Sequence, residues 1–122
     1  MYEVTIKKTF SAAHCIKEIG GKCEALHGHN FLVQVSVAAE SLNNEGLLID
    51  FRVLKQWTEE VLDQLDHKFL NEIDYFKKRN PSSEQIARYL YVRIDERARQ
   101  EKVHLSRVTV WESENSCATY SL

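Results

Sequence analysis

Two histidines separated by a single glycine, His27-Gly28-His29, are the residues of this chain best suited to chemistry. In an extended strand, side chains two positions apart project from the same face with about 6.5–7 Å between their Cα atoms, so both imidazoles can reach one ion. His14 lies upstream, and three protein ligands with a fourth position open are typical of a catalytic zinc site. The spacing therefore indicates a zinc site built from His14, His27 and His29, the alternative being that all three are ordinary half-buried strand residues.

Four further residues could serve such a site. Cys23 precedes His27 by four positions; a free cysteine is often a small buried apolar residue, but a nearby zinc ion would favour its thiolate, a base or nucleophile at neutral pH. Asp66 and His67 either end a helix, with a cation near its negative end, or take part in the chemistry. Glu112 lies inside an apolar stretch, so its carboxylate is either at an exposed edge or bonded to a specific partner.

An alternating pattern predicts two strands that present the histidines. Apolar residues occupy most even positions from Tyr2 to His14, with Lys8 as the exception, so a strand is expected to end at His14. The next strand carries on one parity the residues His27, His29, Phe31, Val33, Val35 and Val37. Provided that no bulge intervenes, the histidines lie at the mouth of a sheet with an apolar interior.

The middle of the chain changes to helical spacing. Asp50 is suited to cap a first helix, which the apolar spacing extends up to Asp66-His67. Ser82 stands in capping-box register with the residue three positions later, at the start of a second helix that runs to about Glu101. The apolar stripes of the two helices are Leu54, Trp57, Val61 and Leu65, and Ile86, Tyr89, Leu90 and Ile94.

Two further strands are expected at the C-terminal end. They span 105–112 and 116–122 and are joined by a tight turn at Glu114-Asn115. With no internal repeat, no low-complexity segment and one proline, residues 1–122 are predicted to form a single α+β domain in the order ββααββ.

Composition narrows the class of partner. Sixteen Lys and Arg against eighteen Asp and Glu leave no basic excess that would attract nucleic acid or an anionic membrane. The chain opens without a charged-then-apolar leader, and its longest aliphatic run, Leu47-Leu48-Ile49, is too short to span a bilayer, so a cytoplasmic protein with a small-molecule partner is expected. Three cysteines without zinc-ribbon or redox spacing argue against a disulfide framework.

Five segments together resemble the successive motifs of the 6-pyruvoyltetrahydropterin synthase family. They are Phe10-Ser11-Ala12-Ala13-His14, Cys23-Glu24-Ala25-Leu26-His27-Gly28-His29, Leu65-Asp66-His67-Lys68-Phe69-Leu70-Asn71, Asn80-Pro81-Ser82-Ser83-Glu84 and Val110-Trp111-Glu112. The resemblance covers essentially the whole chain in the right order. Within the family it is closest to the bacterial branch that forms 6-carboxytetrahydropterin, because three residues separate Cys23 from His27, whereas the pyruvoyl-forming branch typically has a longer separation.

The resemblance implies the tunnelling fold, in which an antiparallel four-stranded sheet carries two helices on one face. It also implies that three sheets join edge to edge into a barrel and that two trimers stack into a homohexamer. The active sites would then lie between subunits. Such an assembly would protect the open edges of the sheet.

The family's site roles carry over to matching positions. The ligands of a Zn²⁺ ion would be His14, His27 and His29. The ion would act as a Lewis acid on the hydroxyls of the substrate side chain. Cys23, as thiolate, would remove a proton from that side chain, with Asp66 and His67 forming the relay that activates it.

The resemblance also implies the substrate and the reaction. Glu112 would accept hydrogen bonds from the 2-amino group and a ring N–H of a pterin. The substrate would be 7,8-dihydroneopterin triphosphate, converted to 6-carboxy-5,6,7,8-tetrahydropterin with release of acetaldehyde and triphosphate, an early step of queuosine biosynthesis. Candidates for holding the triphosphate are Lys7, Lys17 and Lys22.

Three alternatives stay open at this stage. Glu24 is either an ordinary charged loop residue or a second base, as in a subclass of the family whose product is 6-hydroxymethyl-dihydropterin for folate, which would make the enzyme dual-function. The pyruvoyl product is another alternative. A catalytically silent pterin- or metal-binding protein is the alternative from a different class, and the presence of Cys23, Asp66 and His67 argues against it.

Overall fold

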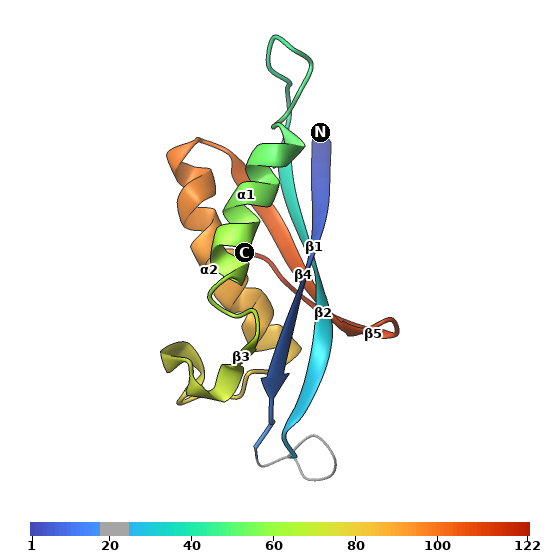
Figure 1. The fold of residues 1–122 in the computed structure, drawn as a ribbon. Coiled ribbons are helices and arrows are strands. Elements are labelled where there is room, and N and C mark those ends of the chain that lie inside the picture. The colour runs from blue at the N-terminus through green and yellow to red at the C-terminus, as the bar shows by residue number, and fades with distance from the viewer. Residues whose placement is uncertain (18–24) are drawn as a thin grey trace.

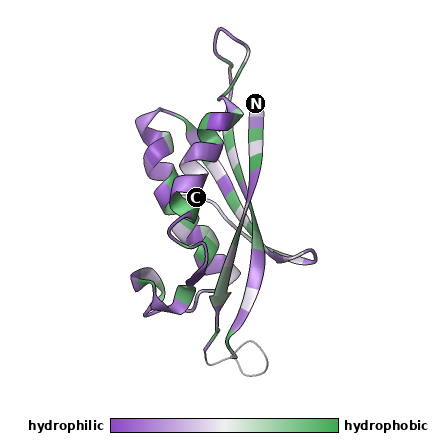
Figure 2. Ribbon diagram, in the orientation of Figure 1, coloured by the Kyte–Doolittle hydropathy of each residue, from purple (hydrophilic) through white to green (hydrophobic). Residues whose placement is uncertain are grey.

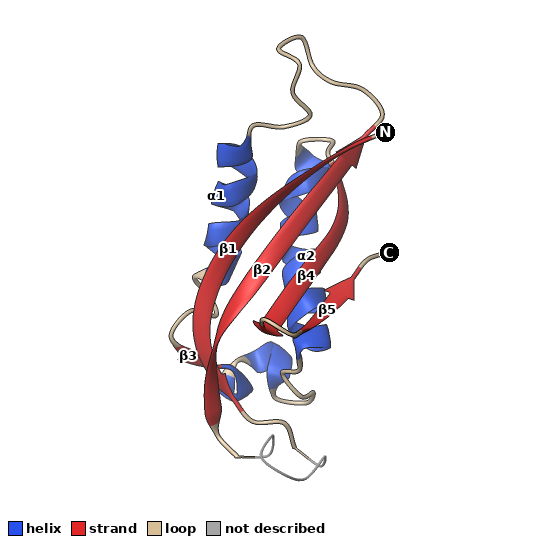
Figure 3. Ribbon diagram, turned by 90° about the vertical axis from the view of Figure 1, so that its right-hand side faces the viewer, coloured by secondary structure: helices blue, strands red, loops and turns tan. Residues whose placement is uncertain are grey.

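Two helices cover one face of a five-stranded sheet (Figure 1, Figure 3). This computed structural model describes residues 1–17 and 25–122. The strand order is β3-β1-β2-β4-β5, and neighbours are antiparallel except β1 and β3, which are parallel. The predicted α+β class with helices on one face is therefore confirmed, whereas the predicted four-stranded antiparallel sheet is wrong, since the sheet has five strands and is mixed.

The two long strands β1 (Tyr2–His14) and β2 (His27–Ala39) bring the histidines together. Their antiparallel register runs without interruption from the pair Tyr2 and Ala39 to the pair His14 and His27. His14 therefore lies directly opposite His27, at the end of the ribbon. The pairing of β1 with β2 contains no bulge between the histidines and the apolar part of β2. The condition on which the sequence pattern placed the histidines beside the apolar interior is therefore met.

The core lies between the sheet and the helices. Hydrophobic and hydrophilic residues alternate along the strands and helices, as expected of elements with one buried face (Figure 2). Lys8, the polar exception on the inner face of β1, reaches α1, where its Nζ lies 3.2 Å from Glu59 Oε1. Fully buried side chains of the predicted faces include Phe31, Val33, Val35, Val37, Leu54, Leu65, Ile86, Leu90 and Ile94.

Helix α1 (Phe51–Leu62) begins as predicted but ends earlier. The Asp50 side chain accepts a hydrogen bond from Arg52 N at 2.8 Å and so caps its first turn. The chain then leaves the helix through tight turns, in which the N–H groups of Leu65 and Asp66 both donate to Leu62 O. The predicted extension to His67 is wrong because Gln64 and Leu65 donate to carbonyl groups three residues back, which replaces the α-helical hydrogen bonding after Leu62. His67, with φ of 58°, then turns the chain away from the helix axis.

The fifth strand, β3 (Lys68–Phe69), follows directly from this turn. His67 N donates to Ser11 O at 2.6 Å, and the next two residues then pair in parallel with Ala12 and Ala13 of β1. Two short 3-10 helices, Leu70–Glu72 and Asp74–Phe76, lead away from it. A two-residue strand has no periodicity of its own, which is why the sequence pattern did not predict it.

The C-terminal half follows the prediction closely. Helix α2 (Ser83–Gln100) is capped by Ser82, whose side chain accepts from Gln85 N at 3.2 Å. Strands β4 (His104–Ser113) and β5 (Ser116–Tyr120) form the predicted hairpin. Their register shifts between Trp111 and Ser113, which leaves Glu112 without an opposite residue in β5. None of the helices in the described part of the chain has the length and apolar character needed to cross a bilayer.

Candidate metal centre

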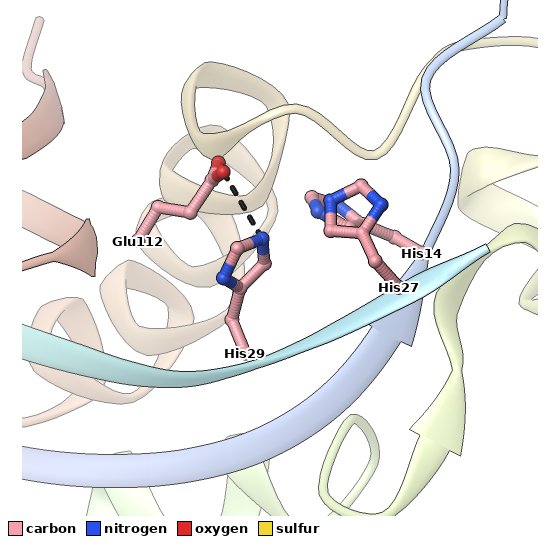
Figure 4. Close-up of side chains that lie close together, drawn as sticks. All are labelled: His14, His27, His29 and Glu112. Carbon is pink, nitrogen blue, oxygen red and sulfur yellow. Dashed lines mark ion pairs between the residues drawn. The ribbon is translucent and has the colours of Figure 1, made fainter. Parts of the chain in front are cut away.

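Four side chains converge at the end of the β1–β2 ribbon, beside the start of α2 (Figure 4). They are His14 from β1, His27 and His29 from β2, and Glu112 from β4. One ligand atom from each lies within 4.8 Å of the corresponding atoms of the others. The three predicted metal ligands are thus brought together, and Glu112 joins them.

Backbone carbonyl groups orient two of the imidazoles. His14 Nδ1 lies 2.8 Å from Pro81 O, and His27 Nδ1 lies 2.7 Å from Ala25 O. A carbonyl oxygen can only accept, so each Nδ1 carries the proton and donates it. The lone pair of each neutral ring is then on Nε2, the atom that is left free to bind a metal ion.

The buried ring of His14 has the protonation state that a metal ligand requires. Burial lowers the pKa of His14, so its ring is neutral near pH 7. Among the described residues, His14 Nε2 is buried and has no hydrogen-bond partner, and the buried His29 Nε2 makes no hydrogen bond but has an ion-pair contact with Glu112 Oε1. Because an unpartnered buried nitrogen costs free energy, the bare Nε2 of His14, facing the other imidazoles and the Glu112 carboxylate, fits a site that could hold a cation.

Glu112 reaches this group because of the irregularity in β4. A bulge re-aims the side chain of the extra residue, and such bulges are frequent beside active sites. Glu112 Oε1 lies 3.1 Å from His29 Nε2, and Ser83 Oγ donates to Glu112 Oε2 at 3.2 Å. Of the two sequence alternatives, the carboxylate bonded to specific partners is the correct one. Ser83 belongs to one of the segments that resemble the family, but its residue type and spacing alone assigned it no role in the site.

Asp66 and His67 lie outside the four-residue group. Asp66 Oδ1 accepts a hydrogen bond from Ser11 N at 2.9 Å, which holds the pKa of this carboxyl below its ordinary value, and lies 3.1 Å from His67 Nδ1. His67 is largely exposed, with 82% of its side chain accessible. Both His67 and His29 line a cavity of about 500 Å³ at the edge of the sheet, with Gly28 also in its wall. The pair is therefore oriented by β1 and open to a neighbouring molecule.

Of the remaining predicted residues, the structure places only Lys7 and Lys17, and they lie in different cavities. Cys23, Glu24 and Lys22 lie outside the described residues. Lys7 lines a cavity of about 480 Å³ together with Trp111, on a different part of the chain from Lys17. Lys17 lies three residues beyond His14.

Comparisons of the sequence and of the structure with known proteins both lead to the 6-pyruvoyl tetrahydropterin synthase family and its relatives. The model of the 6-pyruvoyl tetrahydropterin synthase family matches residues 3–122. The 6-carboxy-5,6,7,8-tetrahydropterin synthase of Synechocystis sp. is 37% identical over 93 residues, covering 72% of this chain and 70% of that protein. The dihydroneopterin monophosphate aldolase of Pyrococcus furiosus is 35% identical over 109 residues, covering 89% and 88%. The structure of the Caenorhabditis elegans 6-pyruvoyl tetrahydropterin synthase superposes with a TM-score of 0.85 at 28% identity, covering 100% and 97%.

Proposed function

The chain belongs to the 6-pyruvoyl tetrahydropterin synthase family, and from this premise we propose that it converts 7,8-dihydroneopterin triphosphate to 6-carboxy-5,6,7,8-tetrahydropterin. Acetaldehyde and triphosphate are the other products, and the pathway is queuosine biosynthesis. The three-residue separation of Cys23 from His27 and the relatives named for the 6-carboxy product favour this reaction over formation of the 6-pyruvoyl compound.

The observation that carries the proposal is the convergence of one ligand atom each from His14, His27, His29 and Glu112 within 4.8 Å of one another, with the buried Nε2 of His14 lacking a hydrogen-bond partner among the described residues. His14, His27 and His29 are the residues that would hold a zinc ion, since zinc favours neutral imidazole ligands in sites of this kind. When bound, zinc would supply Lewis-acid activation of the substrate's side-chain hydroxyls and the adjacent carbon. The carbonyl groups of Pro81 and Ala25 hold the rings in the required tautomer.

The protein's own groups then move the protons. Cys23 is the base that takes a proton from the substrate side chain, and His67 accepts the proton of the thiol. Asp66, kept ionised by the Ser11 N–H, orients His67 and stabilises its protonated form. Because His67 is exposed and outside the four-residue group, we propose that the Asp66–His67 pair of one chain serves the cysteine of another.

A homohexamer built as a dimer of trimers would supply that second chain. In the described part of the chain, β3 pairs only with Ala12 and Ala13, so the rest of the outer edge of β1 carries unpaired backbone groups. Pairing of this edge with another copy would protect it from aggregation. An active site shared between two chains is therefore compatible with pairing of this edge of β1 with another copy of the chain.

Glu112 is proposed to anchor the pterin ring. A carboxylate can accept two parallel hydrogen bonds from the 2-amino group and a ring N–H, which fixes the ring in one orientation. Ser83 Oγ, which donates to Oε2, holds the carboxylate in place. The close approach of Oε1 to His29 Nε2 leaves a competing role, as a fourth metal ligand.

A second candidate product is 6-hydroxymethyl-dihydropterin. The similarity to the Pyrococcus furiosus protein named dihydroneopterin monophosphate aldolase favours it, because an aldol-type cleavage between the two hydroxyl-bearing carbons would leave the carbon attached to the ring as a hydroxymethyl group. Glu24, next to Cys23, is the residue that would act as the additional base. In that case the enzyme would be dual-function and would serve folate as well as queuosine synthesis.

Two substitutions separate binding from proton transfer. Glu112→Gln should raise KM with little change in kcat, because the amide presents a donor to a ring N–H, whereas His67→Asn should lower kcat with little change in KM. Asparagine is the matched replacement at position 67, since it tolerates the left-handed backbone there but cannot take up a proton. Steady-state kinetics with the triphosphate substrate measures both effects.

Zinc content provides the control for this experiment. Both variants should retain the metal content of the unmodified protein, as measured by atomic emission. Loss of zinc in Glu112→Gln would instead make this carboxylate a metal ligand. An exchanged pattern of KM and kcat would mean that the anchor and the relay have been assigned the wrong way round.

A further inference from the structure

We propose that a second cavity of the chain, here called the basic cavity, binds the triphosphate of the substrate. It has a volume of about 270 Å³, and its charged wall is formed by Lys17, Lys77, Lys78 and Arg79. This assignment rests on the proposed function for the identity of the ligand. The chemistry that the cavity recognises, an oligophosphate anion, follows from its residues alone.

The charge of the basic cavity differs from that of the whole protein. The chain as a whole has a formal net charge of −2, yet four cations line this one cavity, and none of the described residues in its wall is a carboxylate. Asp74, beside the cavity, pairs with Lys77 at 2.9 Å. The remaining cations therefore create a strongly positive local potential, which attracts polyanions.

Arg79 keeps its hydrogen-bond donors available. Its guanidinium carbon lies 4.2 Å from the centroid of the Tyr75 ring, so the group is held by a cation–π contact. A guanidinium held in this way still has N–H donors in its own plane, in the geometry that matches phosphate oxygens. Lys17 and Lys78 can supply ammonium groups from other parts of the wall.

Two asparagines make the wall of the basic cavity rigid. Asn71 accepts from Cys15 N at 3.0 Å and donates to Cys15 O at 2.9 Å. Asn80 makes the same double contact with Lys17, with both distances 2.9 Å. Each side-chain amide thus bonds both backbone groups of one residue just after β1, as a neighbouring strand would. The two clamps fix the backbone of Lys17 against the segment that carries the other cations, before any ligand binds.

The basic cavity is close to the metal centre along two backbone segments. Lys17 follows His14 by three residues, a span of at most about 11 Å. On the other segment, Asn80 precedes Pro81, whose carbonyl group orients His14. In the proposed substrate the triphosphate is attached one carbon beyond the two hydroxyl-bearing carbons. A lysine side chain can bridge the remaining distance, so one substrate molecule can occupy both places.

The number of cations in the basic cavity also determines how many phosphate groups a tightly bound ligand should carry. A single phosphate carries at most two negative charges and three terminal oxygens, so it can engage only part of this wall. A triphosphate extends over more of the cations and carries more charge. The basic cavity therefore favours the triphosphate substrate over a monophosphate, in contrast to what the name of the Pyrococcus furiosus relative says of that protein.

Binding of inorganic tripolyphosphate tests the basic cavity directly. Titration calorimetry with the zinc-loaded protein should give binding that a double variant, Lys17→Gln with Lys78→Gln, weakens at least about tenfold, since each lysine makes a charge-assisted contact. Lys55→Gln, an exposed lysine of α1 away from the cavity, is the matched control and should bind as the unmodified protein does. Unchanged binding in the double variant would overturn the proposal.

Kinetics distinguish the substrate from a free oligophosphate. The double variant should raise KM for dihydroneopterin triphosphate about tenfold and raise it much less for dihydroneopterin monophosphate, with kcat preserved. A loss of tripolyphosphate binding without a change in KM would overturn the assignment to the substrate and make the ligand a free oligophosphate. If the protein turns over no pterin at all, the calorimetric result still decides whether the cavity binds oligophosphate, and only the proposed function fails.

Discussion

Replacement of His27 by alanine should remove both the bound zinc and the turnover. Two imidazoles are left, and loss of a direct ligand should cost more than the about 10–100-fold in affinity that is typical of losing a hydrogen-bond partner of a ligand. His27 is the better choice for this test than His14, which is fully buried and packs at 5.6 Å from the Phe31 ring. Truncation of the His14 side chain would open a cavity in the core and destabilise the fold, so a loss of metal could not be distinguished from unfolding.

The matched control for this experiment is His104→Ala. His104 is exposed at the start of β4 and belongs to no part of the metal centre. This variant should keep about one zinc per chain and full activity, and both variants should show the same far-ultraviolet circular dichroism. Full turnover by metal-free His27→Ala protein would refute the assignment of the site.

Replacement of Cys23 by alanine should lower turnover by at least the roughly 100-fold that is typical of removing a general base. Glu24→Ala should change little, because the proposal assigns the proton abstraction to the thiolate alone. Cys117→Ala, which removes an exposed cysteine of β5, is the control for nonspecific effects of losing a thiol. The measurement is the rate of pterin release, with each product separated by chromatography.

The double variant of Cys23 and Glu24 decides between one base and two. If Glu24 is a second base, Cys23→Ala protein should still form 6-hydroxymethyl-dihydropterin while losing the 6-carboxy product. The same carbon–carbon bond breaks for both products, since each keeps one side-chain carbon. A carboxylate at the next position would take a different proton of the side chain and so leave that carbon as hydroxymethyl instead of carboxyl. Appearance of this product in the single variant and its loss in the double variant would favour dual function.

Much of the candidate metal centre could be predicted because the placement of its histidines depends on strand periodicity. The alternation that buries Phe31 and Val33 also fixes the face on which His27 and His29 lie, and a one-residue slip would expose the whole set. The start of α2 could also be predicted from neighbouring residues, since the Ser82 side chain caps the helix by accepting from Gln85 N, three residues later. These features follow from neighbouring residues and need no knowledge of the tertiary fold.

The features that could not be predicted are contacts between distant segments. Strand β3 exists because His67 bonds to Ser11, and the position of Glu112 depends on a register shift with β5. The carbonyl of Pro81, which orients His14, belongs to a residue 67 positions away. None of these has a periodic signal, so the end of α1 and the number of strands were both predicted incorrectly.

Identification of the reaction product tests most directly whether the protein is a 6-carboxytetrahydropterin synthase. Zinc-loaded protein should be incubated with 7,8-dihydroneopterin triphosphate, and the released pterin identified by mass spectrometry alongside an assay for acetaldehyde. We expect 6-carboxy-5,6,7,8-tetrahydropterin, with acetaldehyde and triphosphate formed in equal amounts to it. Formation of the 6-pyruvoyl or 6-hydroxymethyl pterin without acetaldehyde, or binding of the substrate without turnover, would contradict the proposed function.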